Sequence, residues 1–153
     1  MFGNVKILLA TDGSKFSDAA AQAVVAQARP SDTEVRVLHI LEPPSPTASR
    51  ETAGYDPALD ADWWKIEKKL AGELVEGTAE RLRSAGLNVE AAVEEGDPKS
   101  KILDTAKHWG ADLIVLGSHG RKGLVHFLVG SVSEAVARHA KCSVEIVRIP
   151  SDR

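Results

Sequence analysis

Short apolar runs alternate along this chain with longer segments in which apolar residues recur every three or four positions. The runs lie at 5–10, 34–41, 113–116 and 143–149, and a fifth segment, 88–94, alternates apolar and polar residues. Short runs rich in Val, Ile and Leu are typical of buried strands, and regular alternation is typical of a strand with one covered face. The pattern therefore predicts five strands, with 88–94 at a sheet edge.

Four segments between and after these strands have helical periodicity. The first is expected to be capped by Ser14 or Ser17 and to end before Pro30. The second covers 59–85, the third follows residues 96–98 and ends at Gly110, and the fourth begins after Gly130. The chain is thus expected to alternate strand and helix throughout.

The segment 59–85 is the longest of the predicted helices. We expect its core-facing side to consist of Trp63, Ile66, Leu70, Leu74 and Leu82. Of the adjacent Trp63 and Trp64, one is expected in the core and one at its rim, and a partner-binding surface is the alternative.

This alternation indicates an α/β fold: a single doubly wound, five-stranded parallel sheet with helices on both faces and right-handed connections. The 153 residues suit one domain over 1–153. Residues 43–57 are rich in Pro, Ser and Gly and predict an irregular loop, which could be a lid over a site or an insertion without order.

Composition narrows the possible partners and compartment. The formal net charge is −3, which argues against a general nucleic-acid binder, and no apolar run approaches the length that spans a bilayer. The single cysteine, Cys142, can form no internal disulfide and is expected to be a small packing residue. Because the first residues also have no apolar signal core, we expect a cytoplasmic protein.

Glycines and hydroxyls follow the strand at 113–116 and suggest an anion site. Gly117 and Gly120 come at the carboxyl end of that strand, and Gly130, Ser131 and Ser133 stand where the last helix begins. Glycine lets another group approach the backbone, and the first N–H groups of a helix have no internal partner and carry partial positive charge. The stretch therefore predicts binding of a polyphosphate. It lacks the P-loop spacing and the dinucleotide-binding spacing.

The spacing Gly117-x2-Gly120-x9-Gly130-Ser131 resembles the ATP-binding signature of the universal stress protein family. The resemblance extends over nearly the whole chain, through 5–14, 37–40, 96–98 and 144–147. It implies the strand order 3-2-1-4-5, which brings Asp12 beside Gly117 where the order reverses. It also implies a homodimer through strand 5, whose apolar positions include Val144 and Ile146.

The resemblance also implies how a nucleotide is held. Adenine is expected at the backbone of Ile40, the ribose near Asp12, and the phosphates over the glycines. Mg²⁺ is expected to accompany the phosphates, with Asp12 contacting its water ligands rather than the metal itself. The predicted cofactor-binding residues are Ala10, Thr11, Asp12, Ile40, Leu116, Gly117, His119, Gly120, Arg121, Gly130, Ser131, Val132 and Ser133.

Two functions fit these residues. The first is a stress-response regulatory or sensor module that binds ATP or a related adenine nucleotide. The second is a slow ATPase or phosphotransferase that uses the same site, with His119, Arg121 and Lys122 as cations, although no dedicated base is evident. A receiver domain phosphorylated on aspartate is a weaker third possibility, because Asp12 is followed by Gly13 rather than by a second acid.

Overall fold

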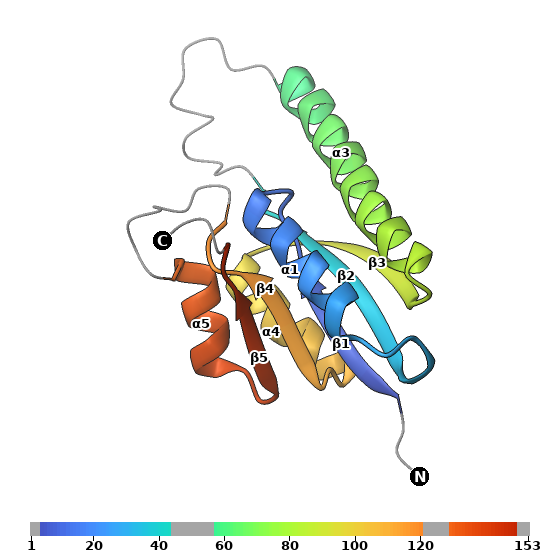
Figure 1. Cartoon of the computed structure of the whole chain (residues 1–153). Helices are drawn as coiled ribbons and strands as arrows, with labels where there is room; N and C mark the ends of the chain where they lie inside the picture. Colours follow the sequence, from blue (N-terminus) through green and yellow to red (C-terminus); the bar gives the residue numbers. More distant parts are fainter. Residues whose placement is uncertain (1–3, 44–56, 121–128, 150–153) are drawn as a thin grey trace.

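A computed structural model describes residues 4–43, 57–120 and 129–149. Five strands form one sheet: β1 (Val5–Ala10), β2 (Thr33–Leu41), β3 (Asn88–Glu95), β4 (Leu113–Gly117) and β5 (Ser143–Val147). Every neighbouring pair is parallel, as the alternation predicted, and the order β3-β2-β1-β4-β5 is the one that the family resemblance implied (Figure 1). The expected irregular segment 43–57 lies almost wholly outside the described residues, and the assignment of 1–153 to a single domain stays a prediction.

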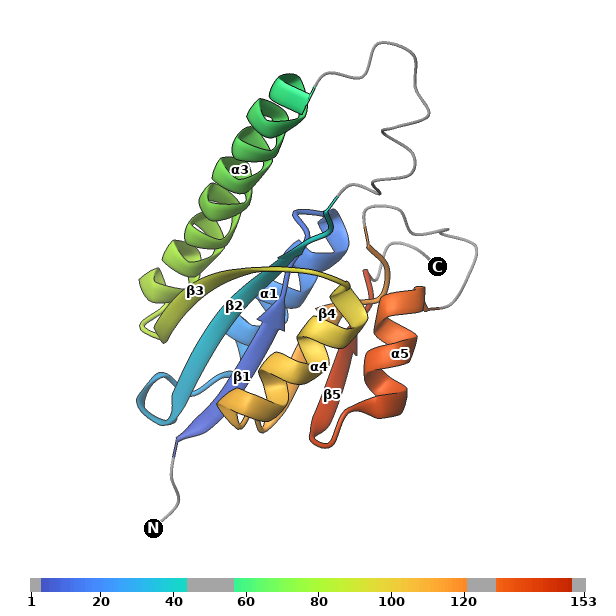
Figure 2. The same ribbon diagram turned by 180° about the vertical axis from the view of Figure 1, so that it is seen from behind.

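Helices cover both faces of this sheet. They are α1 (Lys15–Gln27), α3 (Pro57–Ser84), α4 (Pro98–Trp109) and α5 (Ser131–His139), and a short 3-10 turn, η1 (Pro30–Asp32), leads into β2. Figure 2 shows the sheet from behind, with α4 and α5 on the side opposite α1 and α3. The described part of the chain thus forms a doubly wound α/β layer structure.

The alternation of side chains along the strands divides the core into two clusters. In β1, Ile7 and Leu9 pack with Val24 of α1 and Leu82 of α3, whereas Leu8 packs on the opposite face with the residues of α4 and α5. Successive side chains on a strand point to opposite faces, so a strand covered on both sides must be apolar at nearly every position. This requirement explains the uninterrupted apolar run in β1.

Local signals fix the helix ends. Ser14 caps α1 by accepting from the backbone N–H of Ser17 at 3.2 Å, and Asp97 caps α4 by accepting from that of Ser100 at 3.0 Å. Gly110, at φ +79°, ends α4 in the left-handed conformation that favours glycine. The choice of Ser14 over Ser17 as the cap of α1 was open in the sequence.

The predicted packing face of α3 is wrong over its first half. Trp63, Ile66 and Leu70 are 48%, 56% and 52% exposed, and the side that packs on the sheet instead contains Ala71 and Val75. Both stripes have helical spacing, so periodicity alone favours the one with the larger side chains. The expectation that one of Trp63 and Trp64 lies in the core is also wrong, because Trp64 is only half-buried.

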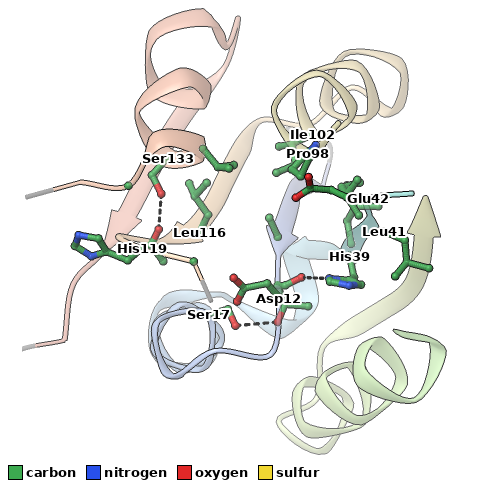
Figure 3. Close-up of a pocket in the computed structure, with 18 of the residues that line it drawn as sticks. Asp12, Ser17, His39, Leu41, Glu42, Pro98, Ile102, Leu116, His119 and Ser133 are labelled. Atoms are coloured by element: carbon green, nitrogen blue, oxygen red, sulfur yellow. Dashed lines mark hydrogen bonds between the residues drawn. The ribbon is translucent and has the colours of Figure 1, made fainter. Parts of the chain in front are cut away.

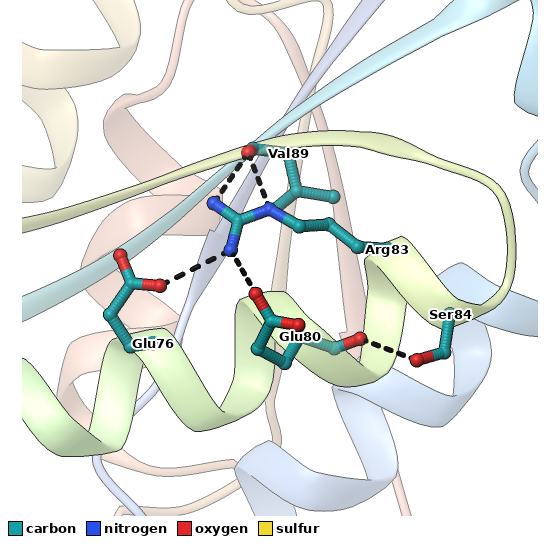
Figure 4. Close-up of polar contacts among 5 residues, drawn as sticks. All are labelled: Glu76, Glu80, Arg83, Ser84 and Val89. Atoms are coloured by element: carbon teal, nitrogen blue, oxygen red, sulfur yellow. Dashed lines mark hydrogen bonds and ion pairs between the residues drawn. The ribbon is translucent and has the colours of Figure 1, made fainter.

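The carboxyl end of α3 is fastened to β3 by Arg83 (Figure 4). Its Nε and Nη2 donate to the carbonyl oxygen of Val89 at 3.2 and 2.9 Å, and its Nη1 donates to Glu80 at 2.7 Å and to Glu76 at 3.2 Å. The hydrogen bond with Glu80, followed by that with Glu76, raises the pKa of the Arg83 guanidinium above its ordinary value. This end of α3 is therefore held by directed bonds, whereas its first half projects beyond the sheet (Figure 1).

Candidate functional site

A cavity of ≈ 410 Å³ opens at the carboxyl edge of the sheet, where β1 and β4 are neighbours. The chain leaves β1 toward one face and β4 toward the other, and in doubly wound sheets ligands bind in the crevice that this reversal creates. Its walls come from the ends of β1, β2 and β4 and from parts of α3, α4 and α5 (Figure 3).

The cavity brings together almost all of the predicted site residues. Those that line it are Ala10, Thr11, Asp12, Ile40, Leu116, Gly117, His119, Gly120, Gly130, Ser131, Val132 and Ser133. Arg121 lies outside the described residues. The part these residues play in binding stays a prediction.

The turn after β1 holds the carboxylate of Asp12 in place. Its Oδ1 accepts from the backbone N–H of Ser14 at 3.0 Å, and Gly13, at φ +80°, makes the turn possible. Behind it, the buried hydroxyl of Thr11 donates to Ser17 Oγ at 3.0 Å. The bond from Ser14 thus helps to orient Asp12 within its own loop.

The glycines of the motif act by close approach. A Cβ on Gly117 would lie 2.6 Å from the backbone carbon of Phe16, and one on Gly120 would lie 2.9 Å from Asp12 Oδ2. A Cβ on Gly130 would lie 3.2 Å from the carbonyl oxygen of Ser118. None of the three has positive φ, so what they supply is space. They let α1 approach β4, Asp12 approach Gly120, and the start of α5 approach the 118–120 loop.

The beginning of α5 faces the cavity without a side-chain cap. Gly130 is the N-cap, and the N–H of Glu134 makes the first intrahelical bond, to the carbonyl of Gly130 at 2.9 Å. The N–H groups of residues 131–133 therefore have no partner within the helix. Ser131 is exposed, whereas the buried Ser133 hydroxyl donates to the carbonyl oxygen of Gly117 at 2.6 Å. Ser133 thus fastens α5 to β4 through its side chain, and its backbone remains at the helix N-terminus.

His119 contributes differently from what the sequence suggested. Its ring packs 5.1 Å from the ring of Phe16, Nδ1 lies 3.2 Å from Ser118 Oγ, and Figure 3 shows the imidazole directed away from Asp12. Among the described residues that line the cavity, Asp12, Glu42 and Glu67 are acidic and none is Lys or Arg. Positive potential in this part of the cavity therefore comes from backbone N–H groups at the start of α5.

The opposite end of the cavity is mostly apolar. There Ile40 and Leu41 end β2, and Nδ1 of His39 donates to the carbonyl oxygen of Thr11 at 2.7 Å. Because a carbonyl only accepts, Nδ1 carries the hydrogen in this contact. The lining residues that sequence reasoning did not assign to a site are Ser17, Leu38, His39, Leu41, Glu42, Trp63, Trp64, Glu67, Pro98 and Ile102. His39, in the segment that resembles the family's adenine site, and the paired tryptophans offered a signal, and their side chains were interpreted as packing.

The arrangement offers little for direct metal ligation. Within 4–43, 57–120 and 129–149, no three His, Cys, Asp or Glu side chains gather closely enough to hold a metal ion. In the same ranges, no helix is sufficiently long and apolar to cross a membrane.

The fold and the cavity define a doubly wound α/β protein with a ligand crevice at its switch point. The family model described as "Universal stress protein family" matches residues 4–148. A putative universal stress protein of Staphylococcus epidermidis is 35% identical over 150 residues, which are 97% of this chain and 86% of that protein. The chain belongs to the universal stress protein family.

Two solved structures have the same fold over nearly the whole chain. A universal stress protein from Lactobacillus plantarum superposes with a TM-score of 0.77 at 27% identity, over 97% of this chain and 100% of that one. A family member from Arabidopsis thaliana with AMP bound gives a TM-score of 0.70 at 19% identity, over 97% and 94%. At such low identity the second likeness shows the shared fold alone.

Proposed function

We propose that this protein binds ATP, with Mg²⁺, in the cavity at the carboxyl edge of the sheet. The observation that supports this most strongly is that one cavity joins an apolar end at β2 to the uncapped N-terminus of α5, with Asp12 between them. A nucleotide has the same sequence of parts: an apolar base, a sugar with hydroxyls, and anionic phosphates. The AMP held by the Arabidopsis relative is consistent with this assignment.

Each part of the nucleotide has a matching part of the cavity. Adenine would lie at the backbone of Ile40, whose N–H and C=O can pair with its edge, and the ribose would lie near Asp12. The phosphates would lie over Gly117, Gly120 and the N–H groups of Ser131, Val132 and Ser133. Ala10, Thr11, Leu116 and the backbone of His119 would complete the walls, and Arg121 remains a candidate cation at the phosphates.

The acidic side chains that line the cavity favour a nucleotide bound as its Mg²⁺ complex. Three carboxylates and no Lys or Arg line its described part, so a cation bound with the phosphates would reduce the repulsion between them and these carboxylates. Carboxylate oxygen is a suitable donor for Mg²⁺ or its waters, and Asp12 provides one next to Gly120. Mg²⁺ would neutralise phosphate charge while Asp12 orients its water shell.

We favour a regulatory or sensor role in the stress response over catalysis. The Ser133 hydroxyl is bonded to the carbonyl oxygen of Gly117, and the His119 ring packs against Phe16. These contacts suit a rigid binding site rather than proton transfer. Release of phosphate at about 1 s⁻¹, within the usual range of enzymes, would instead favour the slow ATPase.

We also propose that two copies associate through β5. This strand ends the sheet, so the backbone groups on its outer side have no strand partner among the described residues. Val144 and Ile146 pack against the cluster under α4 and α5, so the backbone, more than these side chains, would make the contact.

A substitution at Ser131 tests the phosphate cradle. Ser131 is the first residue of α5, where proline fits, and Gly130 already has the extended conformation (φ −72°, ψ 164°) that suits a residue before proline. Ser131→Pro removes one N–H with little harm to the helix, so we expect binding of Mg-ATP about tenfold weaker, the scale of a lost hydrogen bond to a charged group.

Ser131→Ala is the matched control, because it removes only the exposed hydroxyl and should weaken binding less. Titration calorimetry with Mg-ATP, repeated after EDTA, gives both affinities and the dependence on Mg²⁺. Saturating Mg-ATP at about 100 times its Kd should stabilise the wild type by about 2.7 kcal/mol. A wild-type protein that shows neither binding heat nor a change in melting temperature at millimolar Mg-ATP would refute the proposal.

A further inference from the structure

The sheet-facing stripe of α3 continues past the point where the sheet ends. Its members follow at intervals of four and three: Trp64, Lys68, Ala71, Val75, Thr78 and Leu82. The last four are buried against the rest of the protein. The side chain of Lys68 reaches the end of β3, because its Nζ is 3.0 Å from an oxygen of Glu95, the final residue of that strand. Trp64 precedes Lys68 by four residues, about 6 Å further along the helix axis.

The projecting first half of α3 is visible in both Figure 1 and Figure 2. Trp64 lines the cavity together with Leu41 and Glu42, which end β2 and leave it. A half-buried indole on the packing side of a helix, above the end of a strand, is a large apolar surface that the described chain leaves partly uncovered.

Two neighbouring side chains contact this indole. The Nζ of Lys68 lies 5.7 Å from the centre of the Trp64 ring, within the range of a cation–π contact, and 3.0 Å from an oxygen of Glu95. The ring of Trp63 lies 6.3 Å from that of Trp64, centre to centre, and is tilted by 31°. These contacts reduce the freedom that the Trp64 ring would lose when a second flat group stacks on it.

We propose that Trp64 is a specificity-determining residue that contacts the base of the bound nucleotide and favours purines over pyrimidines. This rests on the proposed function, since it assigns the base end of the same cavity. Stacking depends on the shared area of the two ring systems, so a purine gains more from an indole than a pyrimidine does. Lys68 acts as a positioning residue through its contact with the ring.

The experiment separates base contact from phosphate contact. Calorimetry measures Mg-ATP, Mg-CTP and inorganic tripolyphosphate with the wild type, Trp64→Ala and Trp64→Phe. Loss of one base–aromatic stack should weaken ATP about tenfold in Trp64→Ala, reduce the preference for ATP over CTP, and leave tripolyphosphate unchanged. Trp64→Phe, which keeps a smaller ring, should recover part of the ATP affinity.

Fluorescence provides a test that leaves Trp64 in place. The chain has three tryptophans, and Trp109 packs against Lys6 and Arg36 at 5.5 and 4.7 Å, away from the cavity. In the variant Trp63→Phe plus Trp109→Phe, Trp64 is the sole emitter, and Mg-ATP should quench it while tripolyphosphate does not. In the control variant Trp63→Phe plus Trp64→Phe, emission from Trp109 should not change.

The two hypotheses fail in different ways. If the wild type binds ATP but Trp64→Ala binds it equally well, or Trp64 emission is unaffected, the base contact is wrong and the nucleotide site stands. If the wild type binds neither ATP nor tripolyphosphate, the proposed nucleotide site is wrong, and the proposed contact between Trp64 and the base is then wrong as well.

Discussion

At Gly117 the absence of a side chain makes room for a neighbouring backbone. A Cβ there would lie 2.6–2.7 Å from backbone and side-chain atoms of Phe16, closer than real contacts allow. The residue is therefore required by the packing of α1 against β4, and it also lines the cavity. The same reasoning applies to Gly120, whose missing Cβ admits the Asp12 carboxylate.

Gly117→Ala should destabilise the protein by about 1–3 kcal/mol, the usual range for overpacking. Gly72→Ala is the matched control, since Gly72 lies inside α3 with nothing within 4 Å of an added Cβ, and it should stabilise by about 0.5–1 kcal/mol. Denaturant unfolding monitored by circular dichroism measures both. Equal stability of the two variants would contradict this account of Gly117.

Cys142 illustrates a residue whose role was predicted from its type. It is half-buried and packs against the cluster under α4 and α5, as expected of a small packing residue. Burial, the main cause, raises the pKa of its thiol. The folded protein therefore favours the protonated thiol. Its small contribution to the free energy of unfolding is present below the pKa of the thiol in the unfolded chain and is lost as the pH rises through its pKa in the folded protein.

Helix α3 shows the limit of periodicity at the scale of an element. The stripe of large apolar residues that includes Trp63, Ile66 and Leu70 is exposed, whereas the stripe that packs on the sheet is buried from Ala71 onward. Small side chains such as Ala71 and Ala79 let the helix approach the sheet closely, and their burial is a result of that approach.

Val75→Ala and Ile66→Ala form a matched pair of truncations on this helix. Val75 is 3% exposed, so its truncation should cost about 2 kcal/mol of unfolding free energy through lost burial and a residual cavity. Ile66 is 56% exposed, and its truncation should change stability by no more than about 0.5 kcal/mol. Thermal or urea unfolding distinguishes them, and a larger cost at Ile66 would mean that another surface covers this stripe in solution.

At the scale of the whole molecule, the two edges of the sheet provide an internal comparison. Both β3 and β5 have one unpaired side within the described chain. If two copies associate through β5, its outward amides should be protected from hydrogen exchange, whereas those of β3 should exchange rapidly. Sedimentation should give the mass of two chains. A one-chain mass with equally rapid exchange at both edges would rule out this dimer.

Much of the fold followed from the chain because its signals are local. The fully apolar run of β1, the caps Ser14 and Asp97, and Gly110 each act on neighbouring residues, so strand and helix order could be predicted. The register of the sheet and the strand order 3-2-1-4-5 depend on contacts between distant segments, and the order was expected only from family resemblance. The same holds for the gathering of twelve predicted residues in one cavity.

By itself, the sequence determined the alternation of strands and helices, the glycine-rich stretch after β4 and the acid after β1, because each depends on the preferences of adjacent residues. Only the tertiary structure decided that Gly117 makes room for Phe16, that Ser133 is bonded to Gly117, and that Trp64 borders the cavity. These depend on which surfaces approach one another across the fold. The sequence pattern indicates which residues can be buried, but the folded chain determines which atoms each of them contacts.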